Sequence, residues 1–222
     1  MSAPRVRLAV DTATDRLGVA VAVDGQLREA FVDGARRHAG ALLPLADALL
    51  AELGATPADL EEVTVADGPG SFTGLRVAAA VAKALAHDGR VAVRAAPALL
   101  ARGVAALAGA DGTVAVTLDA LRGEVYVACY AVAAGAVTVR QAPVVAPREA
   151  LPPSCLGAAV RRLDDPPPAP AALLALGAMA GGAALVADVR AWEPVYGRRP
   201  EAQVKWEAAH GRALPDPAGP RG

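Results

Sequence analysis

Residues 6–33 read VRLAVDTATDRLGVAVAVDGQLREAFVD and contain three consecutive strand-like runs. The first, from Val6 to Thr14, is a short apolar run that ends in Asp and Thr. The next two runs are joined at Asp24-Gly25, a dipeptide that is favoured in tight β-hairpin turns. The stretch therefore predicts three successive antiparallel strands at the start of an α/β domain.

Helix and strand patterns alternate after this meander. Leucines at positions 42, 45, 49, 50 and 53 have helical spacing, and the pattern closes on Gly54. A strand is then predicted at residues 63–67, a helix from Thr73 to His87, a strand at residues 90–96 and a helix to about Ala108. This order is that of the ribonuclease H-like fold, which the actin, sugar kinase and Hsp70 (ASKHA) superfamily also uses.

The second half of the chain begins in the same way. Residues 112–132 read as strand, turn and strand, and residues 135–146 as a third strand. Beyond Ala146 the pattern weakens, and Asp164–Pro170 reads as a stiff, proline-rich surface link. We therefore expect two related lobes, residues 1–98 and a reduced lobe at 99–210, followed by a tail at 211–222 that is expected to be disordered.

Composition limits the classes of function. The chain has 222 residues and a net charge of -1, so no global field attracts it to nucleic acid or anionic lipid. Cys129 and Cys155 form no metal or disulfide pattern and are expected to be reduced and inert. The N-terminus has no secretory signal pattern, and the longest uncharged run without proline, Ala171 to Ala187, is shorter than a membrane helix. We expect a cytoplasmic protein without a membrane anchor.

Two elements are positioned as phosphate-binding elements are in this superfamily. Asp11 and Thr12 end the first strand, where a carboxylate and hydroxyls approach the phosphates of ATP and its metal. Ala13 stands where kinases and ATPases of this fold usually have a glycine, which lets backbone amides approach the phosphates. The sequence favours a weak or vestigial site over a working one.

The second element is the loop Asp67–Gly74, with sequence DGPGSFTG. It is not a P-loop, because Leu75 and Arg76 follow its last glycine instead of Lys and Ser or Thr. Ser71 or Thr73 can cap the helix that follows. Two interpretations of Gly68, Gly70, Ser71 and Thr73 stay open: a tight strand-to-helix turn, or an anion site at a helix N-terminus.

The helix that follows this loop is nearly smooth because it is rich in alanine. Arg76 and Lys83 lie seven residues apart on one face, with Ala79 and Ala80 between them. Periodicity alone cannot tell whether this stripe packs in the core or docks a second protein.

Metal and nucleophile motifs are absent from the sequence. His38, His87 and His210 are far apart and form no metal-binding pattern, so each is expected to be a surface or capping histidine. No serine lies in a nucleophile elbow. Asp11, Asp67 and Asp119 are a poor match to a two-metal nuclease, because Asp67 precedes a helix-launching loop and Asp119 is in the other lobe.

Four blocks and the C-terminal segment together resemble the TsaB (YeaZ) family. The blocks are LAVDTATDRLGVAVAVDG, RRHAGALLPLADALLAELG, VADGPGSFTGLRVAAAVAKALA and LDALRGEVYVACY, and the ending is WEPVYGRRPEAQVKW. The resemblance spans nearly the whole chain, and residues 68–76 are its most specific part. The longer paralogue TsaD, once described as a glycoprotease, has a His-x-x-x-His metal site where this chain reads VRAAPALLARGVA.

The resemblance implies a non-catalytic subunit of the bacterial complex that makes N6-threonylcarbamoyladenosine beside the anticodon of tRNAs reading codons that start with A. Such a subunit binds and stabilises the catalytic TsaD-like paralogue as a heterodimer and supports recruitment of a TsaE-like ATPase. It meets tRNA indirectly, and it can self-associate as a homodimer through the same helices. The resemblance puts ATP and metal on the partner subunits, with no cofactor in this chain. The implied interface residues are Leu42, Leu45, Leu49, Arg76, Ala79, Ala80 and Lys83.

An independent ATPase or small-molecule kinase of the same fold is the alternative. Tight binding and turnover of ATP by the isolated chain would distinguish it from the scaffold.

Overall fold

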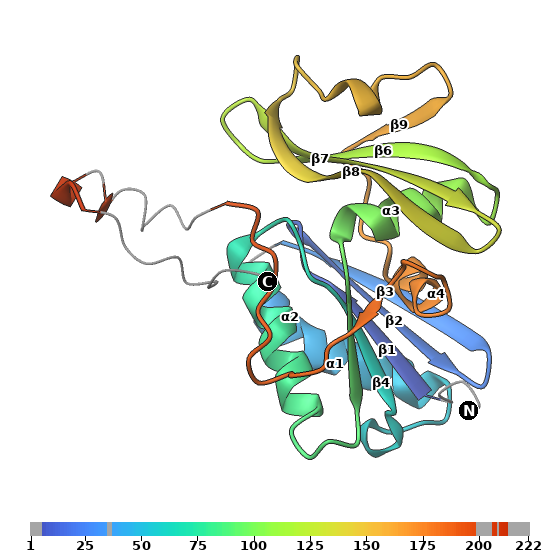
Figure 1. Ribbon diagram of the computed structural model, residues 1–222. Coiled ribbons are helices and arrows are strands. Elements are labelled where there is room, and N and C mark those ends of the chain that lie inside the picture. The colour runs from blue at the N-terminus through green and yellow to red at the C-terminus, as the bar shows by residue number, and fades with distance from the viewer. Residues whose placement is uncertain (1–5, 35–36, 199–205, 208, 213–222) are drawn as a thin grey trace.

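The computed structural model describes residues 6–34, 37–198, 206–207 and 209–212. The predicted tail at 211–222 therefore lies outside the described residues, except for Gly211 and Arg212. Two β-sheets lie one above the other, with short helices between them (Figure 1).

The first lobe contains the elements that the sequence predicts, in the predicted order. They are β1 (Val6–Asp11), β2 (Arg16–Val23), β3 (Gln26–Asp33), α1 (His38–Glu52), the 3-10 turn η2 (Pro57–Asp59), β4 (Glu62–Ala66), α2 (Phe72–Leu85), β5 (Ala92–Ala96) and α3 (Ala98–Leu107). The strand order is β10-β5-β4-β1-β2-β3, with β10 at Ala184–Leu185. β1, β4 and β5 are parallel to one another, whereas β1, β2 and β3 are antiparallel, as the meander predicts.

Alternation along β1 divides the first lobe into two cores. Val6, Leu8 and Val10 belong to the cluster that packs under α1 and α2 on one face of the sheet. Ala9 belongs to the other cluster, which includes residues of α3, of α4 (Pro170–Leu176) and of the second lobe. Because side chains alternate between the faces of a strand, the larger residues meet two helices while small alanines let α4 approach closely.

The second lobe repeats the first meander. It contains β6 (Gly112–Asp119), β7 (Glu124–Ala133), β8 (Ala136–Pro147), the 3-10 turn η3 (Pro153–Cys155) and β9 (Val160–Asp164). Its order, β8-β7-β6-β9, matches β3-β2-β1-β4 of the first lobe, and β9 is parallel to β6 as β4 is to β1. A short turn replaces the helix between the third and fourth strands. The predicted two-lobed fold with a reduced second lobe is confirmed.

The strand β9 was missed, and one boundary needs correction. The pattern of β9 is only five residues long and carries three charges, as suits an edge strand, so it gave no clear strand signal. The predicted second lobe, 99–210, includes α4 (Pro170–Leu176) and β10, but α4 packs on β1 and β2, and β10 pairs with β5. The chain thus returns to the first lobe, where α4 covers the alanine-lined face of the sheet.

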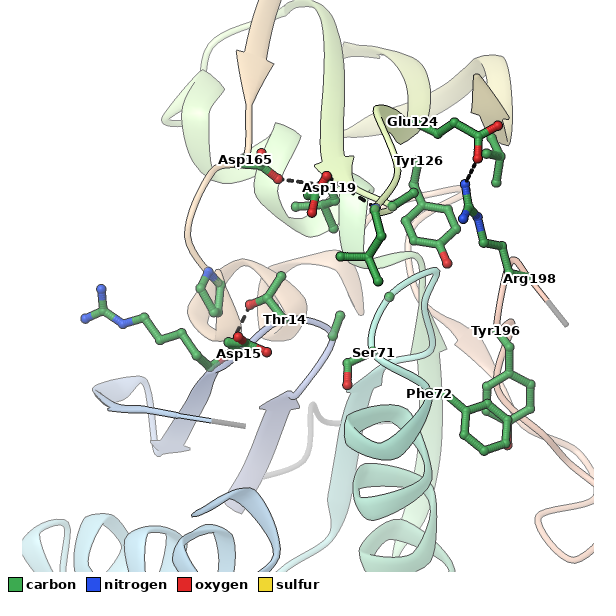
Figure 2. A pocket seen from close by; sticks show the side chains of 18 of the residues that line it. Thr14, Asp15, Ser71, Phe72, Asp119, Glu124, Tyr126, Asp165, Tyr196 and Arg198 are labelled. Carbon is green, nitrogen blue, oxygen red and sulfur yellow. Dashed lines mark hydrogen bonds and ion pairs between the residues drawn. The ribbon is translucent and has the colours of Figure 1, made fainter. Parts of the chain in front are cut away.

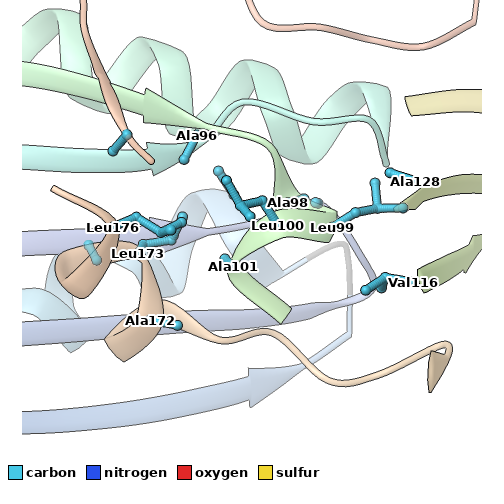
Figure 3. Close-up of a cluster of buried hydrophobic side chains, with 14 of the residues drawn as sticks. Ala96, Ala98, Leu99, Leu100, Ala101, Val116, Ala128, Ala172, Leu173 and Leu176 are labelled. Atoms are coloured by element: carbon cyan, nitrogen blue, oxygen red, sulfur yellow. The ribbon is translucent and has the colours of Figure 1, made fainter. Parts of the chain in front are cut away.

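The hydrophobic contact between the lobes is built around α3 and α4. Leu99 and Leu100 of α3 are fully buried, and Figure 3 places them between Leu173 of α4 and Val116 and Ala128 of the second sheet. Pro168 and Pro170, predicted to lie in a surface link, are buried and close against Gly18. This continuous core fixes the lobes around the cleft described below.

Candidate functional site

The first hairpin and the glycine-rich loop, the two elements considered above as phosphate sites, are in contact with each other. The Ser71 amide donates to the Ala13 carbonyl at 2.7 Å. A Cβ atom placed on Gly70 would lie 2.2 Å from the Ala13 carbonyl oxygen, and one on Gly74 would lie 2.0 Å from the Thr12 carbonyl oxygen. These glycines are therefore needed where the loop meets the first hairpin, and they account for the glycine pattern without a ligand.

Asp11 and Thr12 are fully buried beneath this contact. The Thr12 hydroxyl donates to the Gly74 carbonyl at 2.7 Å. The Asp11 carboxylate forms an ion pair with Arg102 of α3, at 2.8 Å, and both side chains are 0% exposed. Sequence reasoning missed Arg102, because it lies in an apolar helix 91 residues from Asp11 and no spacing rule connects the two.

A cleft of about 1150 Å³ separates the lobes above this contact. Gly70, Ser71 and Ala13 lie on its first-lobe side, and the 118–122 turn on its second-lobe side. Phe72, Tyr126 and Tyr196, three of the few aromatic residues in the chain, also line it (Figure 2).

The charges around the cleft are largely paired with one another. Arg198 pairs with Glu124 of β7. Arg148 pairs with Asp164 at 2.6 Å and with Asp165 at 3.3 Å, and it lies 3.7 Å from Asp119. Hydrogen bonds from Thr117 and then Arg148 lower the pKa of Asp164. A site for a triphosphate needs an excess of positive charge, and these pairs do not supply one.

The C-terminal segment 186–198 runs along the first lobe and ends at the cleft. The Val195 amide donates to the Asp67 carbonyl at 2.6 Å, and a Cβ atom on Gly68 would lie 2.1 Å from the Val195 carbonyl oxygen. A Cβ atom on Gly197 would lie 2.6 Å from Pro69 and 2.7 Å from the ring of Tyr126. The segment thus covers one side of the glycine-rich loop and connects it to the second lobe.

The structure separates the six residues predicted for the vestigial pocket. Gly70 and Ser71 line the cleft, whereas Asp11 and Thr12 are buried below it. Gly68 lies under the C-terminal segment, and Thr73 is exposed in the first turn of α2. The Ser71 hydroxyl accepts from the Gly74 amide at 3.2 Å, so Ser71 is the residue that caps α2. Anion binding at this site stays a prediction.

The predicted interface residues divide between the core and the surface. Leu42 and Leu49 are buried against the first sheet, and Ala79 is buried as well, so assigning these three to an outer interface was wrong. A stripe of leucines at helical spacing marks the side of a helix that faces its own sheet. Leu45 is half-buried, and Arg76 and Ala80 are exposed.

The exposed apolar residues of α1 fall outside that leucine stripe. Leu43 is 47% exposed, and Pro44 and Ala48 are exposed beside it. On α2, Ala80 and Ala84 are exposed. Both helices cover the same face of the first sheet (Figure 1). The sequence signal that could have identified this surface is a set of apolar residues that do not share the helical spacing of the buried leucines. We call the surface formed by Leu43, Pro44 and Ala48 of α1 with Ala80 and Ala84 of α2 the α1/α2 face.

Lys83 of α2 contacts the C-terminal segment of the same chain. Its ammonium group lies 2.9 Å from the Glu193 carboxylate and donates to the Arg190 carbonyl at 3.3 Å. The hydrogen bond from Lys83 to the Glu193 carboxylate, and then a weaker contribution from the Tyr196 hydroxyl, lowers the pKa of Glu193. Arg76 lies over the Phe72 ring at 5.5 Å. Of the two cations predicted to border the docking surface, Arg76 is the exposed one.

Buried titratable groups elsewhere have structural surroundings. His38 is 1% exposed and its Nε2 lies 3.1 Å from the Asp15 carbonyl, so the prediction of a surface or capping position was wrong. Cys129 and Cys155 are free and buried, and burial raises the pKa of both thiols. Burial, with a contribution from Asp67, also raises the pKa of Tyr130.

Among the described residues, no three His, Cys, Asp or Glu side chains form a group that could hold a metal ion. No helix in the described part of the chain is long and apolar enough to cross a membrane.

Two meanders of matching strand order, joined by α3 and facing each other across a cleft, define a two-lobed ribonuclease H-like protein of the ASKHA class. Residues 33–151, more than half of the chain, match the family model described as TsaD: tRNA N6-adenosine threonylcarbamoyltransferase. The chain belongs to this family, and its relatives place it in the TsaB (YeaZ) branch.

The relatives agree in sequence and in structure. The tRNA threonylcarbamoyladenosine biosynthesis protein TsaB of Escherichia coli (strain K12) is 34% identical over 125 residues, which are 55% of this chain and 54% of that protein. A Pseudomonas aeruginosa structure titled as YeaZ has a TM-score of 0.73 and 27% identity, covering 86% of this chain and 99% of that one. A second structure, titled as an uncharacterized protein with similarity to peptidase YEAZ from Pseudomonas aeruginosa, has a TM-score of 0.75 and 28% identity, with 87% and 99% covered. The chain spans about half the length of the curated relatives it matches.

Proposed function

We propose that this chain is the non-catalytic subunit of a complex that makes N6-threonylcarbamoyladenosine in tRNA. It binds and stabilises a TsaD-like catalytic paralogue and supports recruitment of a TsaE-like ATPase. ATP, metal and tRNA are handled by those partners in the cytoplasm. The names of the TsaB relatives and the family match support the pathway.

One observation supports the non-catalytic role above the others. The two elements that would cradle a phosphate touch each other through Gly70, Gly74 and the carbonyls of Ala13 and Thr12. Backbone groups already in van der Waals contact leave no room for a phosphate between them. The Asp11 carboxylate is likewise occupied by Arg102. These features favour a scaffold over an independent ATPase or kinase.

The α1/α2 face is the surface that we assign to the paralogue. It combines exposed apolar residues of α1 with the alanines and Arg76 of α2. Small residues let a second helix pair approach closely, and the exposed cation Arg76 at the border favours one orientation of that pair. The same face serves a homodimer when the paralogue is absent.

Co-purification with the TsaD-like paralogue tests this assignment. Ala80→Trp and Arg76→Glu change exposed residues of α2, so each is expected to weaken the complex by at least about tenfold while the chain stays folded. Glu149→Lys is the matched control, because it reverses one exposed charge in the second lobe. Unchanged affinity in both α2 variants would show that the paralogue binds elsewhere.

Reconstituted threonylcarbamoyl transfer to tRNA tests the function itself. We expect transfer by the paralogue to require this chain and to fall in the Ala80→Trp variant. Transfer that is indifferent to the chain would contradict the proposal. Turnover of ATP by the isolated chain, measured by calorimetry with ATP and magnesium, would instead support the kinase or ATPase alternative.

A further inference from the structure

Arg102 and Asp11 form a fully buried ion pair between the first strand and α3. The shortest contact joins an Arg102 terminal nitrogen to Asp11 Oδ2 at 2.8 Å, and the second terminal nitrogen lies 3.4 Å from Oδ1. Both side chains are 0% exposed. Two charges removed from water in this way lose their hydration, so the pair must be held in good geometry to be tolerated.

The guanidinium group also binds the backbone at two places. Its Nε donates to the Pro166 carbonyl at 3.1 Å, and a terminal nitrogen donates to the Ala98 carbonyl at 2.9 Å. Ala98 opens α3, where the chain leaves the first lobe, and Pro166 lies between β9 and α4, where it returns. Figure 1 shows both crossings between the two sheets. Arg102, which lies on the first crossing helix α3, therefore joins that helix to the end of β1 and to the return crossing at Pro166.

Packing alone does not explain an arginine at this position. The neighbours on α3, Leu99, Leu100 and Ala101, are apolar and buried, and an apolar side chain of similar volume would fill the space without desolvating a charge. The guanidinium group differs from such a side chain in having five donors in a fixed plane. Three of its contacts, two with Asp11 and one with Pro166, use that fixed geometry to hold α3 against two other segments, whereas the contact with Ala98 lies within α3.

We propose that Arg102 is an internal cation that locks the two lobes in one relative orientation. The Asp11 carboxylate, which ends the first strand beneath the cleft, already has its counter-ion within the chain. The arrangement of the lobes around the cleft is consequently independent of any ligand in it. Loss of Arg102 frees the two crossings before it affects either sheet. This role is independent of the partner proposed above.

Hydrogen exchange of the isolated full-length chain, measured peptide by peptide, tests the lock. In Arg102→Gln we expect exchange at residues 98–107, and at the Asp165 and Ala169 amides that lie among the prolines of the second crossing, to be at least about tenfold faster, because a broken buried pair lowers the cost of local opening. Exchange in β1–β3 and in β6 and β7 should change much less. Arg94→Gln is the matched control, because the Arg94–Glu62 pair, at 2.7 Å, joins two strands within the first sheet.

The proposal fails if Arg102→Gln leaves exchange at both crossings unchanged, or accelerates it evenly over the whole chain. It also fails if Arg94→Gln accelerates the crossings as much. If Arg102→Gln does not fold, the charge-free variant Asp11→Asn/Arg102→Met decides, because it leaves no buried charge unpaired. Fast exchange confined to the two crossings in that variant supports the lock, and wild-type exchange there overturns it.

Discussion

The ring of Tyr196 lies 4.6 Å from the ring of Phe72, so the end of the C-terminal segment packs on the first turn of α2. The same segment pairs Glu193 with Lys83 further along the helix. Segment and helix together therefore form the border of the α1/α2 face. A residue far along the chain thus shapes the surface that we assign to the partner.

Removing the Tyr196 ring should loosen this segment. In Tyr196→Ala we expect trypsin to cleave after Arg190 several-fold faster, because the segment loses its aromatic contact and opens more often. Limited proteolysis followed by mass spectrometry measures the rate. Cleavage after Arg140 on β8 is the internal reference, and equal acceleration at both sites would mean global destabilisation instead.

The pKa of Glu193 predicts a small loss of stability in acid. Because the pKa of this carboxyl is lower in the folded chain, its contribution is complete above its ordinary value of 4.5 and is lost as pH falls below it. The side chain is 48% exposed, so screening limits the contribution to about 0.5 kcal/mol. Urea unfolding at pH 7 and pH 3.5 should show that Glu193→Gln lacks this component. An equal pH dependence in both proteins would contradict the prediction.

Substitution by alanine should have opposite effects on the stability of the chain at Gly74 and at Gly40. A methyl group at Gly74 would lie 2.0 Å from the Thr12 carbonyl oxygen, so Gly74→Ala should destabilise the isolated chain by about 2–3 kcal/mol. Gly40 lies in the first turn of α1 with nothing within 4 Å, so Gly40→Ala should stabilise it by up to about 1 kcal/mol. Urea unfolding measures both. A harmless Gly74→Ala would show that the glycine serves something other than this close contact.

Leu42 and Leu43 are adjacent in α1, but one is buried in the core and the other is exposed. Leu42 is 0% exposed in the core, so Leu42→Ala should lower the free energy of unfolding by about 2–4 kcal/mol. Leu43 is 47% exposed, so Leu43→Ala should change it by less than about 1 kcal/mol while weakening binding to the paralogue. Chemical unfolding and co-purification separate the two effects. The assignment of faces is wrong if Leu43→Ala destabilises the fold as much as Leu42→Ala.

Tyr130 should make the fold sensitive to alkali. Burial raises the pKa of its phenol in the folded chain. The contribution of Tyr130 to the free energy of unfolding is therefore fully present below pH 10.0, the ordinary pKa of tyrosine, and is lost as the pH rises above it. The loss is expected to approach about 1.4 kcal/mol per pH unit. Tyr130→Phe should remove this slope between pH 9 and 11. Its hydroxyl has no hydrogen-bond partner among the described residues, so Tyr130→Phe should not destabilise the chain at pH 7.

The predicted elements through residue 147 were recovered because their signals are local. The Asp24-Gly25 turn, the leucine stripe of α1 and the Ser71 cap each depend on residues close in sequence. β9 and the return of α4 to the first sheet were missed, because short, charged or alanine-rich segments take their places from the surfaces they cover.

The candidate site was less predictable than the fold. The glycine-rich loop and the Asp11 hairpin were both recognised in the sequence. Only the structure shows that their backbones are in direct contact, so that each occupies the space where a ligand of the other would lie. Leu42 and Leu49 were placed on the wrong side of α1, since helical spacing identifies a stripe without saying whether a sheet or a partner covers it.

The sequence by itself determined the two meanders, the glycine-rich loop and the membership of the TsaB branch, because turn dipeptides, strand alternation and a specific motif are written in consecutive residues. The tertiary structure decided which charges meet. Arg102 reaches Asp11, and Lys83 reaches Glu193, from positions about a hundred residues apart. Such pairs depend on how whole elements pack, and burial then determines the strength of each interaction.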